Sequence, residues 1–297
     1  MALTAQQKQY YMDVIARTGG HRETMKTERR IPGDYLAWQD RVERKEQMLD
    51  LPGMAAPVRI IITAAKDRAE LCPVHVNLHG GGFVYPQDGD DDLYCAHLAG
   101  ALRGIVVDVD YALSQDHPFP AAFDQCYLVT KWVFSRCEAW GADPKRVSLG
   151  GHSAGGNLTA AVSLKAARTG EFRLCLQVLD YSATDSYMAL EQKLDRSVAF
   201  SMLYGDGSEE TLKSPYCSPC RAPDEMLRDQ PPTLIVGAGL CPFREVNEQY
   251  ALRLARAGTP VQIREYPGSR HAFTVRMIDD WQAAQEDIIR AIREAGL

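Results

Sequence analysis

The sequence predicts an α/β fold, with a mostly parallel sheet, helices on both of its faces and a helical cap. Short β-prone runs alternate with longer stretches of helical periodicity from residue 56 onward, and this alternation is typical of parallel sheets covered on both faces. The stretch from Arg146 to Ala167 has the pattern of a strand, a sharp turn and a helix. Two polar stretches, residues 1–55 and 182–228, interrupt the alternation and are expected to form the cap.

Length and charge restrict the function. A chain of 297 residues can form one large α/β catalytic domain, here residues 56–297, with the cap added to it. The net charge of −6 and the pI near 5.7 provide no basic surface for phosphates. We therefore expect a small-molecule substrate and no nucleic-acid or membrane partner. The N-terminus lacks the apolar region of a secretory signal, and no apolar run of about 18 residues is present, so we expect a cytoplasmic protein.

The eight cysteines are scattered through the chain, mostly among apolar residues. This distribution is typical of reduced thiols in a core and not of a disulfide framework. Cys217 and Cys220 form a lone C-x-x-C without a second pair or nearby histidines. Packing within a loop is therefore favoured over a zinc or redox role, and we predict no metal site.

The elements follow one another in a regular order. Residues 1–55 are polar and helix-prone, and residues 174–181 form a strand before the second polar stretch. The other predicted strands are Val58–Ala64, Val74–Leu78, Ile105–Val109, Val147–Leu149, Thr233–Ala238 and Val261–Tyr266, of which the second and third are expected to be central and buried. Helices are predicted from about residue 121 to Gly141, from Leu158 to Gly170, over Val246–Ala257 and over Met277–Ala295.

The pentapeptide Gly151-His152-Ser153-Ala154-Gly155 lies at the bend between a predicted strand and a predicted helix. A G-x-S-x-G turn holds its serine in a strained conformation with the hydroxyl exposed, and a side chain at either flanking glycine would collide with the neighbouring strand or helix. Chance could produce the pentapeptide, but the strand-turn-helix context argues against chance. Ser153 is therefore the candidate nucleophile.

Two further segments carry groups that a serine nucleophile requires. The segment His79-Gly80-Gly81-Gly82-Phe83 follows a strand directly, and its glycines leave backbone N–H groups free to approach a ligand, as in an oxyanion hole. A flexible glycine-rich turn is the alternative, but the serine downstream favours the functional interpretation. His271 lies in the loop after the last predicted strand, where a histidine can serve as the general base.

Taken together, these residues resemble the hormone-sensitive-lipase-like esterases of the α/β-hydrolase fold, over about residues 55–295. The resemblance rests on segments that occur in the family's order: His79 to Phe83, Asp110-Tyr111 with His117 to Ala122, Asp143 to Val147, Gly151 to Leu158, and His271-Ala272-Phe273. It implies an eight-stranded sheet, a helical cap over the site, a possible homodimer through the last strand and helix, and hydrolysis of short-chain carboxylic esters without a cofactor.

The resemblance also implies the site residues. Ser153 matches the nucleophile, His271 matches the general base, and Gly81, Gly82 and Ala154 match the backbone donors of the oxyanion hole. His152 stands where the family usually carries aspartate, which is a minor departure. The departure at the position of the catalytic aspartate is serious, because this chain has Cys241 there, in Cys241-Pro242-Phe243-Arg244.

Three candidates could replace the missing carboxylate beside the histidine. Glu245 lies one helical turn after Cys241 and could reach back, although an acidic residue also suits a helix N-terminus. Asp180 ends the preceding strand, where some lipases of this fold place the acid, although it could instead pair with a neighbouring loop. Cys241 could act as a thiolate, because a helix N-terminus and an imidazole both lower a thiol pKa. We rank Glu245 first, Asp180 second and Cys241 third.

The expected function is that of a serine esterase which cleaves acetyl or other short acyl esters through an acyl-serine intermediate. A ligand-binding protein without turnover is one alternative, since the plant gibberellin receptors resemble the same family. Such receptors tolerate the loss of triad members, whereas Ser153 and His271 are both present here. An amidase or peptidase that uses the same residues is another alternative.

Overall fold

The computed structural model describes residues 2–19 and 21–296. Its described strands form one eight-stranded sheet in the order β1-β2-β4-β3-β5-β6-β7-β8. Only β2 runs antiparallel to its neighbours, and the remaining pairs are parallel. The strands are β1 (Val42–Leu49), β2 (Val58–Ala65), β3 (Cys72–Leu78), β4 (Ile105–Asp110), β5 (Ala142–His152), β6 (Leu176–Asp180), β7 (Thr233–Ala238) and β8 (Val261–Tyr266). The predicted fold class is confirmed.

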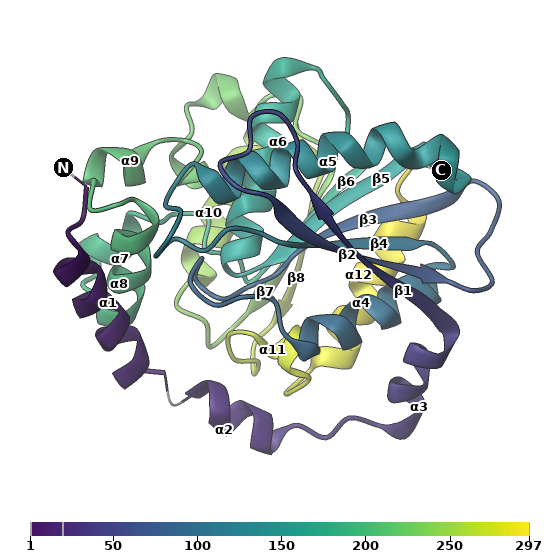
Figure 1. The fold of residues 1–297 in the computed structure, drawn as a ribbon, viewed down its shortest axis with the longest axis horizontal. Helices are drawn as coiled ribbons and strands as arrows, with labels where there is room; N and C mark the ends of the chain where they lie inside the picture. The colour runs from purple at the N-terminus through teal and green to yellow at the C-terminus, as the bar shows by residue number, and fades with distance from the viewer. Residues whose placement is uncertain (1, 20, 297) are drawn as a thin grey trace.

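Helices cover both faces of the sheet. Figure 1 shows α5 (Ala121–Trp140) and α6 (Ala154–Thr169) above the sheet, and α4 (Gly89–Leu102) and α12 (Trp281–Glu294) below it. Every residue of β3 is buried between these layers, as expected for a central strand of a parallel sheet. The helix α10 (Arg244–Arg256) packs against β7 and β8 at the other end of the sheet. Parallel strands place their carboxyl ends at one edge, and the loops that follow them meet there.

The N-terminal segment reaches from the cap to the far edge of the sheet. The helix α1 (Ala5–Arg17) packs against α8 of the cap, and α2 (His21–Glu28), α3 (Gly33–Leu36) and η1 (Ala37–Arg41) lead from it to β1 (Figure 1). The prediction that residues 1–55 are a cap element is wrong for residues 42–49, which form β1. The eight residues of β1 pair with β2 along their whole length, so the sheet begins earlier than the sequence suggested.

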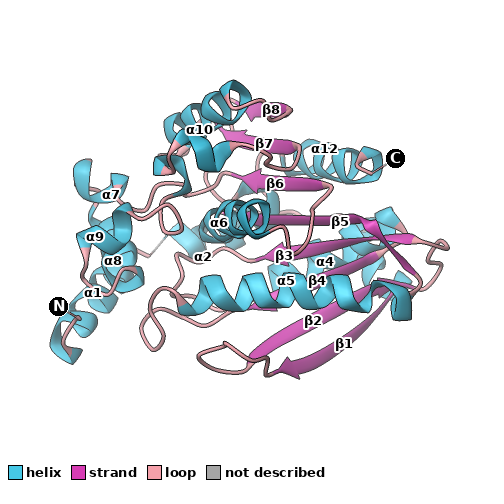
Figure 2. Ribbon diagram, turned by 90° about the horizontal axis from the view of Figure 1, so that it is seen from above, coloured by secondary structure: helices cyan, strands magenta, loops and turns pink. Residues whose placement is uncertain are grey.

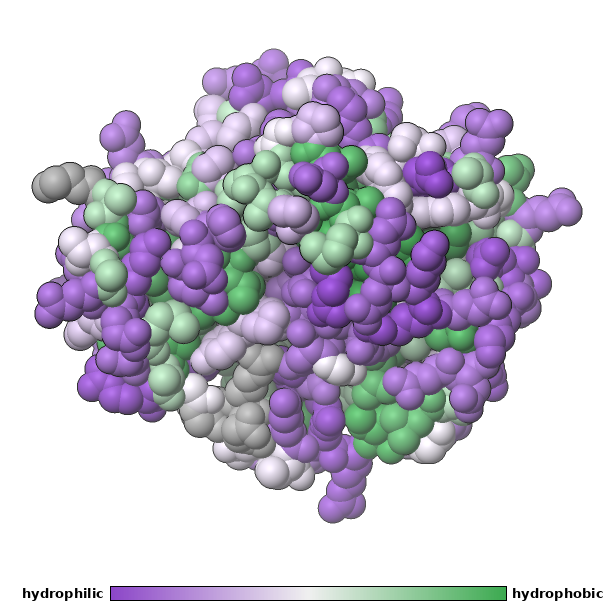
Figure 3. Space-filling view, in the orientation of Figure 1, coloured by the Kyte–Doolittle hydropathy of each residue, from purple (hydrophilic) through white to green (hydrophobic). Residues whose placement is uncertain are grey.

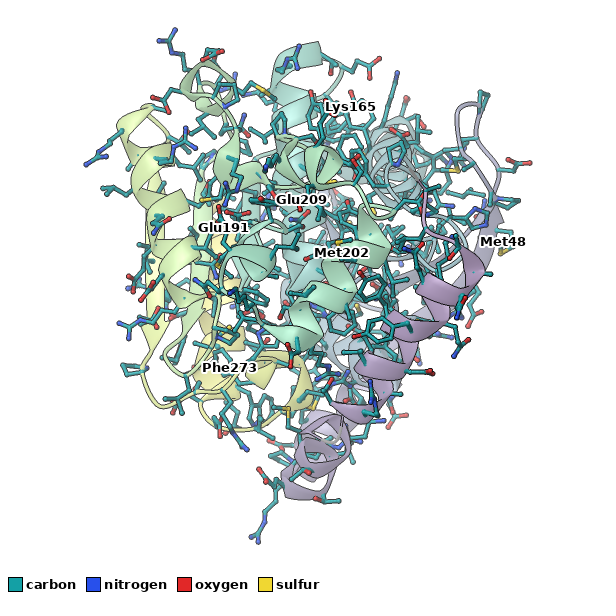
Figure 4. The ribbon with its side chains drawn as sticks, turned by 90° about the vertical axis from the view of Figure 1, so that its left-hand side faces the viewer. Met48, Lys165, Glu191, Met202, Glu209 and Phe273 are labelled. Atoms are coloured by element: carbon teal, nitrogen blue, oxygen red, sulfur yellow. The ribbon has the colours of Figure 1, made fainter. Side chains whose placement is uncertain are left out.

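The second polar stretch is helical. It contains α7 (Met188–Glu191), α8 (Asp195–Tyr204), α9 (Glu209–Lys213), η2 (Pro219–Arg221) and η3 (Asp224–Leu227). Figure 2 shows α1, α7, α8 and α9 grouped beyond one end of the strands, and Figure 4 shows Glu191, Met202 and Glu209 on this helical group, with Phe273 on a separate helix. The cap is therefore made of segments from two distant parts of the sequence.

The C-terminal helix is shorter than predicted. Residues Phe273–Arg276 form the short helix α11, and Met277 and Asp279 have left-handed backbone angles with φ of 57° and 53°. These two residues break the helical path, so α12 begins only at Trp281. Its buried face includes Ile288, Ile289 and Ile292.

The surface is largely polar. Figure 3 shows hydrophilic residues over most of one face, with apolar residues in smaller patches between them. Within residues 2–19 and 21–296, no helix is both long and apolar enough to cross a membrane.

Candidate active site

Ser153 occupies the turn between β5 and α6 in a strained backbone conformation, with φ of 56° and ψ of −115°. At this turn the backbone of the glycines passes close to the backbone of Leu78 at the end of β3. A Cβ on Gly155 would overlap the carbonyl oxygen of Leu78, and a Cβ on Gly151 would lie 2.5 Å from the carbonyl group of Gly155. Only glycine fits at either position. The predicted strand-turn-helix unit is confirmed, and Ser153 lines a cavity at the carboxyl edge of the sheet.

His271 lies in the loop between β8 and α11, with its Nε2 atom 3.0 Å from Oγ of Ser153. This distance is that of a hydrogen bond between a nucleophile and its base. The rings of Tyr181 and Phe243 meet the imidazole edge-on, with centroids 5.0 and 5.4 Å away. Burial, assisted by the positive charge of Arg196, lowers the pKa of His271 to about 4. The imidazole is therefore neutral at physiological pH and free to accept a proton.

The other ring nitrogen of His271 faces a thiol. Sγ of Cys241, which follows β7, lies 3.0 Å from Nδ1 of His271, and the backbone N–H of Phe243 donates to the same sulfur at 3.4 Å. Burial raises the pKa of Cys241 to about 12. The third-ranked alternative, a Cys241 thiolate, is therefore not supported, because the loss of solvation outweighs the stabilisation by the N–H of Phe243. Cys241 is a neutral thiol at physiological pH.

Neither candidate carboxylate takes this place beside Nδ1. Glu245 lies on the exposed side of α10 and forms no hydrogen bond or ion pair with the described residues. The preference for Glu245 is therefore not supported by the geometry, because its position in the first turn of α10 directs it to solvent. Asp180 is buried at the end of β6, where Oγ1 of Thr274 donates to its Oδ2. Burial raises the pKa of Asp180 well above its usual range, and its Oδ2 atom accepts a hydrogen bond from Thr274 and not from His271.

The glycine-rich loop after β3 lies beside the serine. Gly81 and Gly82 have φ of 125° and 62°, and with Ala154 they line the same cavity as Ser153. Among the described residues, the N–H groups of these three have no backbone acceptor, and Ala154 is the first residue of its helix, where N–H groups are free. Unpaired N–H groups beside a nucleophile are suited to binding an oxyanion.

Aromatic side chains hold this loop in place. The hydroxyl of Tyr111 donates to the carbonyl oxygen of His79 at 2.7 Å, and the two rings stack with centroids 4.1 Å apart. Phe83 at the end of the loop stacks on Tyr204 of α8 with centroids 3.7 Å apart. The oxyanion loop is therefore fixed both to the sheet and to the cap.

His152, which precedes the nucleophile, has a partner that the sequence did not indicate. Its Nε2 atom lies 2.8 Å from Oδ1 of Asp91 on α4, and both side chains are buried. The ring also packs against the glycine-rich loop, because a Cβ on Gly80 would lie 3.0 Å from Cδ2 of His152. The pair links the nucleophile turn, the oxyanion loop and α4. Asp91 follows Asp88 in a capping box that begins α4, a pattern that could have been found in the sequence.

The cavity beside Ser153 has a volume of about 520 Å³, within the usual range for small-molecule sites. Its walls come from the oxyanion loop, the loop of His271, the cap helix α8 and Met25 of α2. Within the described residues, no cluster of three or more histidine, cysteine, aspartate or glutamate side chains could hold a metal ion. The eight cysteines are free, and the C-x-x-C pair Cys217 and Cys220 is buried in the cap.

Comparison with known proteins identifies the family. A family model described as alpha/beta hydrolase fold matches residues 75–275. The chain belongs to this family. Esterase LipI of Mycobacterium tuberculosis is 33% identical to it over 238 residues, which are 76% of this chain and 73% of that protein. Hormone-sensitive lipase of Mus musculus is 38% identical over 95 residues, 32% of this chain and 12% of that protein.

Solved structures agree with this assignment. Carboxyl esterase 2 from the fungus Tuber melanosporum superimposes with a TM-score of 0.79 at 27% identity, covering 86% of this chain and 88% of that chain. The resemblance to hormone-sensitive-lipase-like esterases is thereby confirmed, as is the eight-stranded sheet that it implied.

Proposed function

We propose that this protein is a serine carboxylic ester hydrolase which cleaves short-chain, acetyl-type esters through an acyl-serine intermediate. One observation carries the proposal: Oγ of Ser153 lies 3.0 Å from Nε2 of a neutral, half-buried His271, in a cavity lined by Gly81, Gly82 and Ala154, whose N–H groups have no backbone acceptor among the described residues. The esterases among the relatives support the same activity.

In this mechanism Oγ of Ser153 attacks the ester carbonyl while Nε2 of His271 accepts the serine proton. The carbonyl oxygen becomes an oxyanion that accepts hydrogen bonds from the three N–H groups. The imidazolium then returns its proton to the leaving alkoxide, and the acyl-serine remains. Water repeats the sequence with the same base and releases the acid. The reaction needs no cofactor.

We assign the place of the usual triad acid to the thiol of Cys241. For Nε2 to accept the serine proton, Nδ1 of His271 must carry hydrogen, and it then donates to Sγ of Cys241 at 3.0 Å. A neutral sulfur orients the ring but stabilises the imidazolium weakly. The site is therefore a serine-histidine dyad with a thiol as the orienting group, and Glu245 has no catalytic role in it.

The test is Ser153→Ala, measured on an aryl acetate with the purified proteins. We expect hydrolysis to fall by about 10³- to 10⁶-fold with the fold intact, because the nucleophile is lost and alanine fits the turn. Activity that persists in this variant would assign the chemistry to another residue. Binding of the acetate without turnover by the wild type would instead favour a ligand-binding protein, and faster cleavage of the matching acetanilide would favour an amidase.

We further propose a cytoplasmic enzyme that has no nucleic-acid partner and forms a homodimer along β8. The eight free cysteines suit a reducing compartment. The strand β8 is the edge of the sheet, and Ile263 on it is 44% exposed, so its open backbone groups could pair with a second copy. Light scattering during size exclusion would measure twice the monomer mass for the wild type, and an unchanged monomer mass would reject the dimer.

A further inference from the structure

Arg196, Arg270 and Arg276 line the cavity beside Ser153, and they differ in whether a described carboxylate pairs with them. Nη2 of Arg270 lies 3.0 Å from Oδ1 of Asp279, and Nη1 of Arg276 lies 2.9 Å from Oδ2 of Asp88. Arg196 of α8 has no hydrogen bond or ion pair with any described residue, and its Nε–H is buried without an acceptor. No described residue therefore compensates the positive charge that Arg196 brings to the cavity.

The carboxylates of the cavity are not available to this arginine. Asp91 is paired with His152 at 2.8 Å. Asp185 accepts from Nε of Arg221 through both oxygens, at 2.8 and 2.9 Å. The Arg196 guanidinium is thus left as a donor facing a cavity that would hold a substrate. A half-buried guanidinium without an acceptor is costly for the protein alone, and an anionic ligand would relieve that cost.

Phe200 and the end of α1 lie beside the guanidinium. Phe200 lies one helical turn after Arg196 on α8, and Cζ of Arg196 is 5.4 Å from the centre of its ring. The same ring presses on the oxyanion loop, because a Cβ on Gly82 would lie 2.6 Å from it. In addition, Nη2 of Arg196 lies 3.7 Å from the position of a Cβ on Gly19, at the end of α1. The end of a helix favours a cation there but offers it no carboxylate.

The position of Arg196 relative to His271 determines which part of the substrate Arg196 would face. Arg196 and His271 line the same cavity, and the charge of Arg196 is near enough to contribute, after burial, to the lowered pKa of His271. His271 gives its proton to the leaving alkoxide, so the alcohol part of the ester lies beside His271 in this cavity.

We propose that Arg196 binds a carboxylate on the alcohol part of the substrate, so that the enzyme prefers short-chain esters of carboxylate-bearing alcohols or phenols. This inference rests on the proposed ester hydrolase function. A guanidinium binds both oxygens of a carboxylate through parallel N–H groups. The two Nη groups of Arg196, which are not among the buried atoms, can supply this pair of donors.

The experiment compares 4-acetoxybenzoate with 4-acetoxybenzamide, which have similar size and differ in charge. The measured quantity is the ratio of kcat/KM for the carboxylate to kcat/KM for the amide. We expect this ratio to be about 10- to 100-fold higher in the wild type than in Arg196→Gln, from the usual strength of a hydrogen bond to a charged group. Effects of Arg196 on His271 itself act on both esters and cancel in the ratio. Arg196→Lys should give an intermediate ratio.

Two controls accompany the ratio. Arg173→Gln removes the same charge from an exposed arginine outside the cavity, and it should keep the wild-type ratio. Raising the ionic strength should lower the wild-type ratio, because salt screens the attraction. Equal ratios in the wild type and Arg196→Gln would overturn the inference while leaving the esterase proposal in place.

A binding measurement separates the two proposals if neither ester is hydrolysed. In Ser153→Ala, calorimetry should find 4-hydroxybenzoate bound at least tenfold more tightly than 4-hydroxybenzamide, and the additional change Arg196→Gln should abolish the difference. The absence of turnover would reject the esterase proposal alone. Equal binding of the two phenols would reject the carboxylate site.

Discussion

Replacing Cys241 by aspartate is expected to make the enzyme faster. The sulfur of Cys241 lies 3.0 Å from Nδ1 of His271 and is a neutral thiol, since burial raises its pKa to about 12. An imidazolium forms at His271 only during the reaction. A carboxylate at this position would stabilise that cation directly, whereas the thiol offers a weak acceptor.

The size of the gain follows from the distance. Opposite charges about 4 Å apart attract by about 4 kcal/mol at the effective dielectric of a partly buried site, which corresponds to about 10³-fold in rate. The cost of burying the carboxylate is present before and during the reaction, so it lowers the stability of the fold and not kcat. We therefore expect Cys241→Asp to raise kcat by about 10²- to 10³-fold and to lower Tm.

The pH profile provides an independent readout. Activity requires neutral His271 and is lost as the pH falls through its pKa, which is about 4 in the wild type. A carboxylate beside the ring favours the charged form and raises this pKa. The acid limb of kcat/KM should therefore lie near pH 4 in the wild type and at a higher pH in Cys241→Asp.

The assay is steady-state hydrolysis of 4-nitrophenyl acetate, with active sites counted by the acylation burst. Cys241→Asn is the matched control, because it has the shape of aspartate without its charge and should not exceed the wild-type rate. A folded Cys241→Asp with less than about a threefold gain would refute the reasoning. The lack of a negative charge at position 241 would then not be what limits kcat of the wild type.

Three other changes test different parts of the site. Glu245→Gln should alter kcat by less than about twofold, because Glu245 is exposed on α10; a loss of about 10²-fold would restore it as the acid. Gly155→Ala should lower the free energy of unfolding by about 2 kcal/mol or more, since its Cβ overlaps the carbonyl of Leu78, and a denaturant titration with an unchanged midpoint would contradict this. Aryl esters from acetate to decanoate should show a graded maximum at two to about four carbons, at ~1 kcal/mol per methylene, and a maximum at eight or more would count against a short-chain enzyme.

Some secondary-structure elements could not be predicted, because they form through contacts that local sequence patterns do not show. Residues 42–49 bury only Val42 and Leu49 deeply, so they lack the alternation of apolar and polar residues by which a half-buried strand is predicted. Their strand conformation comes from backbone hydrogen bonds to β2. The helix α4 between β3 and β4 was likewise not predicted, although Asp88 and Asp91 form a capping box at its start.

The sequence by itself determined the nucleophile turn, the glycine-rich loop and the mostly parallel character of the sheet. These features are marked by short local patterns, such as the pentapeptide around Ser153 and Gly170, which ends α6 in a left-handed conformation with φ of 65°. The same local patterns led to the family resemblance. They placed Ser153 and His271 at the ends of strands that a parallel sheet brings to one edge.

Only the tertiary structure decided what lies next to His271. Sequence spacing favoured Glu245, but the path of the chain after β7 buries Cys241 against the imidazole and leaves Glu245 in solvent. The charge state of that thiol and the free guanidinium of Arg196 also emerged only from the fold. A pKa and an unmet hydrogen bond depend on desolvation and on distances between residues far apart in the chain, and local sequence patterns specify neither.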